Sequence, residues 1–542
     1  MPTVTLNRNV VESLIGKKTP IEKLRDRISM LGTDLESISD TEIVVEIFPN
    51  RPDMLCEQGF ARALSSFLNI KTGLKNYTVQ KSGYFCKVEK TLEVWPYTVN
   101  AIVKNLKFDD ESIREVMQLQ EKLGTTLTRH RKKGGIGIYP LDKIKFPIRF
   151  TTMKLNEIKF RPLDSSKEMY ADEILEKHPA GIKYSNILQN QKEQPVFIDA
   201  NNQILSIPPI INSYDTGRIT QSTKDVFIEC SGPDLNILNV ALNIIVTSLA
   251  DMGGKIFSID VINKNKKITT PDLSPKTMNL DVKYVNKILG LNLKEKEIKK
   301  YLMMMGFDYK NKNALVPSYR NDILHQIDLI EEIAIAFGYE HFPTEITSFG
   351  SIAEEDQFEK FKRKIQDILV SLSFIQVNAF CLTNEDKINK KMNTNYDTVK
   401  LLNSINQEYN AFRYWLLPSS LEVLKNNKSS ELPHKIFEIG RTFNSKNELD
   451  HLCAVISNSK TNFTELKQIL DALFSALGLE HQIEEMNHPS FIEGRVGSVI
   501  VNSKSIGFIG EIHPSVLSNW DLENPVVAFE LNLSDLFNKI KF

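Results

Sequence analysis

The chain has 542 residues, of which 41% are hydrophobic and 25% are charged, a composition that is ordinary for a soluble globular protein. At about 100–200 residues per domain, this length is expected to hold about three to five domains. Lys and Arg total 67 and Asp and Glu total 68, which gives a formal net charge of -1. This balance excludes a protein coated in basic charge, but it permits a local basic patch that binds nucleic acid.

The cysteines are scattered, and no two lie within three residues of each other, which argues against zinc-ribbon and thioredoxin motifs and suits a reducing cytosol. The N-terminus lacks the charged and apolar segments of a secretory signal. The most apolar stretch, 235–249, is interrupted by asparagines and falls short of the roughly 20 apolar residues that span a bilayer. We therefore expect a cytoplasmic protein with no membrane partner.

Two domains are predicted in the first half of the chain. Residues 1–80 read as an α+β domain, with a strand at 4–6, a helix at 19–30 and a strand at 43–48 before a second helix. Residues 81–268 mix strands and helices. Within them, "KDVFIECSG" alternates like a half-buried strand, and "DLNILNVALNIIVTSLADMGG" reads as a largely buried helix that two glycines end.

Two further domains are predicted in the second half. Residues 269–346 read as a small α+β domain that closes with the helix "DILHQIDLIEEIAIAFG", which Gly338 ends. Residues 347–542 begin with a helix at 356–374 and then consist mainly of strands, so we expect an antiparallel sheet packed with helices. The fold class predicted for the whole chain is therefore α+β and multidomain.

The acidic helix of the third domain carries the sharpest local pattern. The apolar residues Ile323, Ile327, Ile330, Ala334 and Phe337 recur at helical spacing and predict one buried stripe. Asp328, Glu331 and Glu332 are then expected on the opposite side, with Asp322 near the helix start. Carboxylates this close repel one another unless a cation neutralises them, and oxygen ligands suit Mg²⁺. The alternative is a solvated acidic face.

Two polar segments are candidates for ligand binding. The basic run "RHRKK" at 129–133 is of a kind that contacts phosphates, although such a run is also typical of a solvated loop. The segment "PPIINSYDTGRITQSTKDVFIEC" gathers polar side chains in a strand-rich stretch and could hold a small polar ligand or an ester. Its alternative interpretation is a hairpin with hydrogen-bonded turn residues.

Common catalytic motifs are absent from the sequence. It has neither a GxxxxGK[ST] phosphate loop nor a GxGxxG motif, and the glycines of "KGGIGIY" do not fit that spacing. It also lacks the HExxH zinc helix and the GxSxG elbow. Local chemistry alone therefore indicates no more than a large α+β protein.

Several ordered segments together resemble one family. They span nearly the whole chain and include "FPNRPDMLCEQGFARAL", "PPIINS…STKDVFIECSG", "VPSYRNDILHQIDLIEEIAIAFGYEHFP", "FEIGRTF" and "HPSFIEGRVGSVIVNSKSIGFIGEIHPSVL". The chain resembles the β subunits of phenylalanine–tRNA ligase, a class II aminoacyl-tRNA synthetase, in their shorter archaeal and eukaryotic form. The resemblance implies that 81–268 is an editing domain and that 347–542 is a class II synthetase-like domain without catalytic activity.

The resemblance also implies partners and a division of labour. It predicts a tetramer of two α and two β chains in which the α subunit binds ATP and phenylalanine and charges the tRNA. The β chain would contact the tRNA and hydrolyse mischarged tyrosyl-tRNA. The alternatives are an architectural tRNA-binding subunit without active editing, and a free-standing tRNA-interacting protein.

Site residues carry over from the family to matching positions. The resemblance places a magnesium site at Asp322, Asp328, Glu331 and Glu332, with a structural role. It places editing residues at Asn212, Ser213, Thr223 and Glu229, and a basic pair at Arg131 and Lys132. Tyr139 and Pro140 depart from the His-Asp of eukaryotic members, so hydrolysis by a histidine at that point is not expected here.

Overall fold

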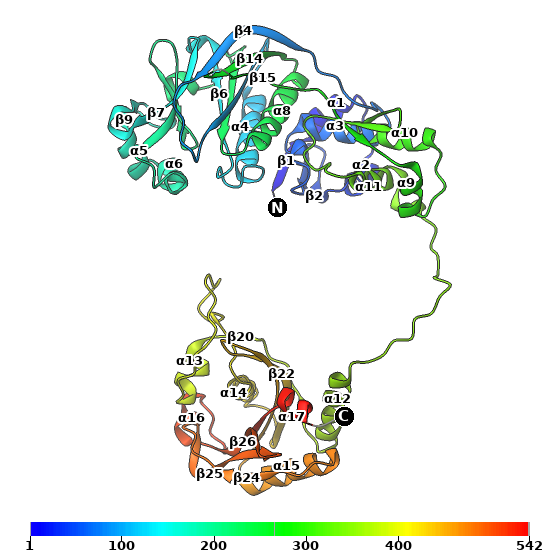
Figure 1. Cartoon of the computed structure of the whole chain (residues 1–542), viewed down its shortest axis with the longest axis vertical. Coiled ribbons are helices and arrows are strands. Elements are labelled where there is room, and N and C mark those ends of the chain that lie inside the picture. The colour runs from blue at the N-terminus through cyan, green and yellow to red at the C-terminus, as the bar shows by residue number, and fades with distance from the viewer. Residues whose placement is uncertain (1, 265, 540–542) are drawn as a thin grey trace. The chain divides into compact units, whose positions relative to one another are not determined.

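The computed structural model describes residues 2–264 and 266–539 and divides into two compact units, 1–345 and 346–542 (Figure 1). Both units combine helices with sheets, in agreement with the α+β prediction. In the described part of the chain, no helix combines the length and the apolar character that a membrane span needs.

The first unit begins with a small antiparallel sheet in the order β1-β3-β2. Its elements are β1 (Thr3–Asn7), α1 (Arg8–Ile15), α2 (Ile21–Met30), β2 (Asp34–Ile38), β3 (Glu42–Glu46) and α3 (Glu57–Phe67). The helix predicted at 19–30 begins two residues later than expected. Pro20 explains the shift, because the residue before a proline is disfavoured in helical conformation.

A ten-stranded sheet forms the centre of the first unit, in the order β12-β11-β10-β7-β4-β14-β5-β13-β6, with β15 paired to β14. Its strands are β4 (Val79–Val88), β5 (Tyr97–Lys104), β6 (Gly135–Pro140), β7 (Ile148–Lys154), β10 (Glu193–Ile198), β11 (Ile204–Ile207), β12 (Ile211–Asn212), β13 (Val226–Gly232), β14 (Lys255–Asn263) and β15 (Lys266–Thr270). The associated helices are α4 (Asp110–Thr125), α5 (Ala171–Lys177), α6 (Pro179–Tyr184), α7 (Tyr214–Gly217) and α8 (Leu235–Asp251), and β8 (Lys159–Phe160) pairs with β9 (Met169–Tyr170).

Strand β13 is buried on both faces, so the expectation of a half-buried strand is wrong. It pairs with β5 on one side and with β6 on the other. Val226 and Ile228 face a core that includes α8, whereas Phe227 faces a second core on the opposite side of the sheet. A strand covered on both faces carries few polar positions, and those that remain, such as Glu229, are therefore informative.

A third sheet of the first unit, in the order β16-β18-β17, packs with three helices. Its elements are β16 (Lys276–Asn279), α9 (Val282–Leu289), α10 (Glu295–Met304), β17 (Asp308–Lys310), β18 (Asn313–Val316) and α11 (Gln326–Phe337). Helix α8 contacts both α3 and the large sheet, and one continuous hydrophobic core joins the three sheets of this unit. The long buried helix predicted from the sequence is thus confirmed as α8.

Helix α11 differs from its prediction at its start and in its buried face. His325 is the N-cap residue, so the helix begins at Gln326 and Asp322 lies outside it. Ile330 and Ala334 are buried as expected, but Ile327 is 38% exposed. Gly338 ends the helix as predicted, with a φ of 95°.

The second unit is built on a seven-stranded sheet in the order β19-β22-β23-β27-β26-β25-β24. Its strands are β19 (Ile375–Gln376), β22 (His434–Phe443), β23 (Glu448–Ser457), β24 (Gln482–Glu485), β25 (Phe491–Val501), β26 (Lys504–Ile512) and β27 (Val526–Asn532), and β20 (Leu382–Thr383) pairs with β21 (Ala411–Phe412) separately. All neighbouring strands of the sheet are antiparallel except β19 and β22, which are parallel.

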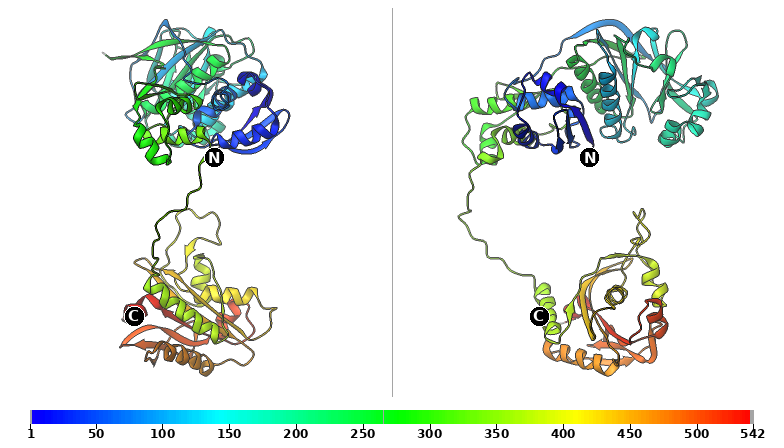
Figure 2. Two further views of the ribbon diagram at one scale, coloured as in Figure 1. Left: turned by 90° about the vertical axis from the view of Figure 1, so that its right-hand side faces the viewer. Right: turned by 180° about the vertical axis from the view of Figure 1, so that it is seen from behind.

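Helices cover both faces of this sheet (Figures 1 and 2). The helices are α12 (Gln357–Ser371), α13 (Glu385–Ile388), α14 (Leu417–Asn426), α15 (Phe463–Leu477), α16 (Pro514–Asn519) and α17 (Leu533–Lys539). Along β23, Leu452 and Ala454 face a core with α12 and α15, while Cys453 and Val455 face a core with α14. This alternation follows from the two-residue period of a strand.

Candidate functional site

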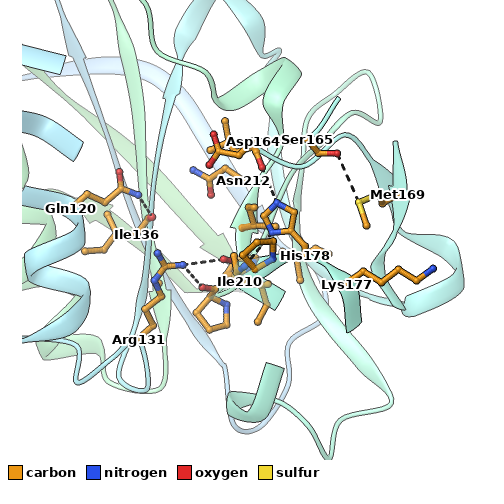
Figure 3. Close-up of a pocket in the computed structure, with 18 of the residues that line it drawn as sticks. Gln120, Arg131, Ile136, Asp164, Ser165, Met169, Lys177, His178, Ile210 and Asn212 are labelled. Atoms are coloured by element: carbon orange, nitrogen blue, oxygen red, sulfur yellow. Dashed lines mark hydrogen bonds between the residues drawn. The ribbon is translucent and has the colours of Figure 1, made fainter. Parts of the chain in front are cut away.

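A cavity of about 590 Å³ opens beside the large sheet and gathers several of the predicted editing residues (Figure 3). Arg131, Asn212 and Glu229 line it. Asn212 comes from β12, Glu229 from β13, and Arg131 from the turn between α4 and β6. The sheet therefore brings together three predicted residues that lie far apart in the sequence.

Glu229 is buried at the wall of this cavity, and no basic side chain of the described residues pairs with it. Its side chain belongs to a residue that is 1% exposed, and the Tyr139 hydroxyl donates a hydrogen bond to its Oε1 at 3.2 Å. Its other oxygen, Oε2, has no hydrogen-bond partner among the described residues. Burial raises the pKa of Glu229 to about 8, although hydrogen bonding from the hydroxyls of Tyr139 and Ser231 acts in the opposite direction.

A glycine opposite Glu229 leaves room for this arrangement. Gly137 on β6 is the partner of Glu229 in the strand register. A Cβ atom at Gly137 would lie 2.6 Å from Glu229 Oε1 and closer still to the Tyr139 hydroxyl. Glycine is therefore required at this position because any side chain would displace one of the two groups.

Arg131 shapes the cavity instead of presenting a free cation to it. Its Nη1 donates to the carbonyl oxygens of Pro209 and Ile210, at 3.0 Å each, and its guanidinium lies 4.2 Å from the ring centre of Tyr184. The φ of Arg131 is 64°. Burial lowers the pKa of its guanidinium. These contacts hold the basic run 129–133 against Pro209 and Ile210, which precede β12.

The other predicted editing residues lie outside this cavity. Ser213 is 2% exposed and lines a neighbouring cavity of about 670 Å³. Thr223 is 6% exposed, and its hydroxyl accepts a hydrogen bond from the Thr220 amide at 3.0 Å, which is the turn contact that the alternative interpretation expected. Lys132 is exposed and lines neither cavity.

Several cavity residues were not predicted from the sequence. Gln120 on α4 donates to the Ile136 carbonyl at 2.7 Å, and Asp164 lies in the loop before α5. His178 bonds the Leu163 carbonyl through Nε2 at 3.0 Å and accepts from the Ala180 amide at Nδ1, so both ring nitrogens are engaged (Figure 3). The histidine thus holds the loop in place. No sequence pattern links these segments, because only the fold brings them together.

The four acidic residues predicted to bind magnesium, on α11 and in the loop before it, divide into two pairs. Arg320 donates to Asp322 at 2.7 and 2.8 Å, and to Glu332 at 2.7 Å. Their side chains are 2%, 9% and 8% exposed, respectively. Glu332 therefore lies on the buried side of α11, contrary to the prediction, and Arg320 neutralises both carboxylates.

Asp328 and Glu331 form the second pair, on the outer side of α11. Asp328 accepts hydrogen bonds from the amides of Leu324 and His325, at 2.8 Å each, and so caps the helix. Both residues line an apolar cavity of about 480 Å³. Over residues 2–264 and 266–539, no three His, Cys, Asp or Glu side chains are grouped so that they could hold a metal ion.

The sequence matches known proteins along 99% of the chain, and the fold matches a solved structure over 62% of it. The chain is 39% identical over 556 residues to the phenylalanine–tRNA ligase β subunit of Pyrococcus abyssi, with 99% of this chain and 100% of that protein covered. It is 38% identical over 548 residues to the β subunit of Archaeoglobus fulgidus, with 99% of each chain covered. The chain belongs to the family of phenylalanine–tRNA ligase β subunits.

Matches to domain families and to a solved structure agree with this assignment. Residues 278–339 match the tRNA synthetase B5 domain, and 343–533 match the phenylalanyl-tRNA synthetase β chain CLM domain. A crystallised N-terminal fragment of the β subunit from Pyrococcus horikoshii superposes with a TM-score of 0.60 at 37% identity. The match covers 62% of this chain and 99% of the fragment. The resemblance inferred from the sequence is therefore confirmed.

Proposed function

We propose that this chain is the β subunit of a cytoplasmic phenylalanine–tRNA ligase and attaches phenylalanine to its tRNA together with an α subunit. Full-length similarity to β subunits carries this proposal. We propose a tetramer of two α and two β chains in which the α subunit binds ATP and phenylalanine. Residues 347–542 act as a structural counterpart of a class II catalytic domain, because the sequence has no Gly-rich, Arg-bearing strand of the third class II motif.

Co-purification tests this first proposal. The chain alone, and the chain expressed with an α subunit from the same genome, are compared for charging of phenylalanine tRNA. We expect stoichiometric co-elution and activity only in the pair. A chain that neither binds an α subunit nor gains activity from it would instead be a free-standing tRNA-interacting protein.

We further propose that 81–268 is an editing domain that hydrolyses mischarged tyrosyl-tRNA in the cavity at Glu229. Tyrosine differs from phenylalanine by one hydroxyl, and an apolar pocket rejects such an analogue by only about 100-fold. A second site that hydrogen-bonds the hydroxyl discriminates better, because phenylalanine leaves its polar groups unpaired. The unpaired Oε2 of Glu229 is the observation that supports this role.

Removing either polar group of the cavity tests this proposal. Glu229→Ala and Asn212→Ala should leave phenylalanine charging intact and allow tyrosyl-tRNA to accumulate. Lys177→Ala is a matched control, because Lys177 lines the same cavity but projects from α5. If neither change slows tyrosyl-tRNA hydrolysis relative to this control, the assignment of the editing site is wrong.

The alternative is an architectural tRNA-binding subunit without active editing. One observation favours it: the Tyr139 hydroxyl already bonds Asn212 and Glu229, the two groups that would recognise a substrate. Absence of tyrosyl-tRNA hydrolysis by the wild-type complex, together with normal charging, would establish this alternative.

We also propose that Mg²⁺ is a structural cofactor bound through Asp328 and Glu331, with water completing its coordination. Mg²⁺ is commonly held by one or two carboxylates and several waters, so this pair suits it. Asp322 and Glu332 are engaged by Arg320, and we therefore place them outside the direct ligand set. When bound, the ion would neutralise the outer side of α11.

A further inference from the structure

We propose that Tyr139 is a positioning residue for editing, because its hydroxyl orients Asn212 and Glu229 toward a substrate phenol. This inference rests on the proposed editing function and adds to it a residue that departs from the eukaryotic family pattern. Tyr139 does not line the cavity itself. Tyr139 lies behind the cavity wall and acts through Asn212 and Glu229, which line the cavity.

The ring of Tyr139 is fixed in the core below the cavity. The residue is 0% exposed, and its ring centre lies 5.8 Å from that of Phe227, which is its partner in the register of β6 and β13. Strand pairing and packing therefore determine where the hydroxyl lies. A hydroxyl held in this way can orient its partners with little cost in side-chain entropy.

Tyr139 leaves one hydrogen-bonding atom free on each partner. Its hydroxyl lies 3.3 Å from Asn212 Oδ1 and 3.2 Å from Glu229 Oε1, and it has only one hydrogen to donate between them. Asn212 keeps its amide Nδ2 as a donor, and Glu229 keeps Oε2, which has no partner among the described residues, as an acceptor. Two residues that line the cavity thus supply one donor and one acceptor, of which Oε2 is buried just behind the wall.

A phenol matches this pair because its hydroxyl both donates and accepts. The tyrosine side chain of a mischarged tRNA can donate to the Glu229 carboxyl group and accept from Asn212 Nδ2, since both residues line the cavity. Phenylalanine satisfies neither group and would bury both unpaired, which is costly. Without Tyr139, Asn212 and Glu229 would be free to bond each other and remove the site that distinguishes the two amino acids.

The opposite role for Tyr139 makes the opposite prediction. If its phenol occupied the place of the substrate's phenol, removal of the hydroxyl would free Asn212 and Glu229 and accelerate tyrosyl-tRNA hydrolysis. If Tyr139 positions them, the same change slows it. The sign of the effect therefore decides between the two roles.

The test uses the complete complex with its α subunit and compares wild type with Tyr139→Phe. The measured quantity is the ratio of hydrolysis rates for tRNA carrying tyrosine and tRNA carrying phenylalanine. We expect the ratio to fall by about tenfold, as for a buried polar group that loses its hydrogen-bond partner, while phenylalanine charging stays unchanged. Tyr309→Phe is the matched control, because Tyr309 is a buried tyrosine of the third sheet.

The pH profile separates positioning from general damage. The titratable groups that act on Glu229 or that Glu229 acts on are Tyr139 from β6, Cys86 from β4 and the adjacent Cys230. Four further titratable groups line the same cavity, namely Arg131, Asp164, Lys177 and His178. Because the Tyr139 hydrogen bond lowers the pKa of Glu229, its loss should move the pH dependence of the hydrolysis ratio to higher pH.

Asn212→Asp provides a second variant in case Tyr139→Phe does not assemble. It keeps the Oδ1 acceptor for Tyr139 but deletes the Nδ2 donor, so the ratio should again fall. An unchanged or increased ratio in Tyr139→Phe, or an unchanged ratio in Asn212→Asp, would overturn the positioning role while leaving editing itself established. A wild-type complex that does not hydrolyse tyrosyl-tRNA would overturn the proposed editing function, and the role of Tyr139 with it.

Discussion

Replacement of Arg320 by leucine tests whether the buried carboxylates of Asp322 and Glu332 depend on Arg320 for charge compensation. Arg320 bonds Asp322 and Glu332 in a site where all three side chains are less than one-tenth exposed. Removing one partner of a buried ion pair costs roughly 3–5 kcal/mol, because the remaining charge is left uncompensated. Here two carboxylates lose their partner at once, so we expect a cost in this range or above it.

Arg27→Leu is the matched control. Arg27 makes an ion pair with Glu340 at 2.9 Å, but the two side chains are 26% and 34% exposed. A solvent-exposed pair of this kind contributes about 0–1 kcal/mol. The same substitution should therefore be several times more costly at Arg320 than at Arg27.

Hydrogen exchange of the α11 amides in increasing urea measures the free energy of opening for this part of the full chain. Adding Asp322→Asn and Glu332→Gln to Arg320→Leu should recover most of the loss, since neither side chain then carries a charge that lacks its partner. Equal effects of Arg320→Leu and Arg27→Leu would refute the reasoning. Recovery of Arg320→Leu by added Mg²⁺ alone would show that a metal ion can neutralise Asp322 and Glu332.

Three further predictions concern other sites. Burial raises the pKa of Glu115 to about 9, so its carboxyl group binds a proton more tightly in the folded chain than in the unfolded chain. The free energy of unfolding should therefore fall as the pH rises from about 5 to 9. Urea unfolding should show Glu115→Gln losing this dependence; an equal fall in the variant would contradict it. Gly137→Ala should slow tyrosyl-tRNA hydrolysis while leaving charging intact, because the added Cβ displaces Glu229. In calorimetric titration, Glu331→Gln should weaken Mg²⁺ binding about tenfold or more, whereas Asp322→Asn should not. Equal weakening by the two changes would instead support the site of four carboxylates that was predicted from the sequence.

The sequence predicted the elements of the fold better than the environments of their charged residues. Helix α8 and the end of α11 at Gly338 follow from local patterns that the structure retains. The burial of Glu332 does not, because spacing along a helix defines faces but does not say which residues a neighbouring segment covers. Arg320, which covers Glu332, belongs to the loop before α11 and reaches it only through the fold.

The cavity proposed for editing shows the same limit. Asn212, Glu229 and Arg131 were predicted from their resemblance to family positions, and the structure places them along one cavity. The contribution of Tyr139 could not be predicted, because it depends on the register of β6 with β13 and on the position of β12. A departure from a family pattern is visible in the sequence, but its consequence requires the geometry.

A comparison with the other buried carboxylates supports the proposal that editing depends on Glu229. Asp53 pairs with Arg51, and Glu438 pairs with Arg413, so their charges are compensated. Asp199 has no such cation but accepts hydrogen bonds from three backbone amides. Glu229 accepts one from Tyr139, leaves Oε2 unpaired and borders a cavity. Glu115 is also buried without a cation among the described residues, but it does not line this cavity. An uncompensated buried carboxyl group lowers stability, and at a cavity wall such a cost supports a position retained for binding or catalysis.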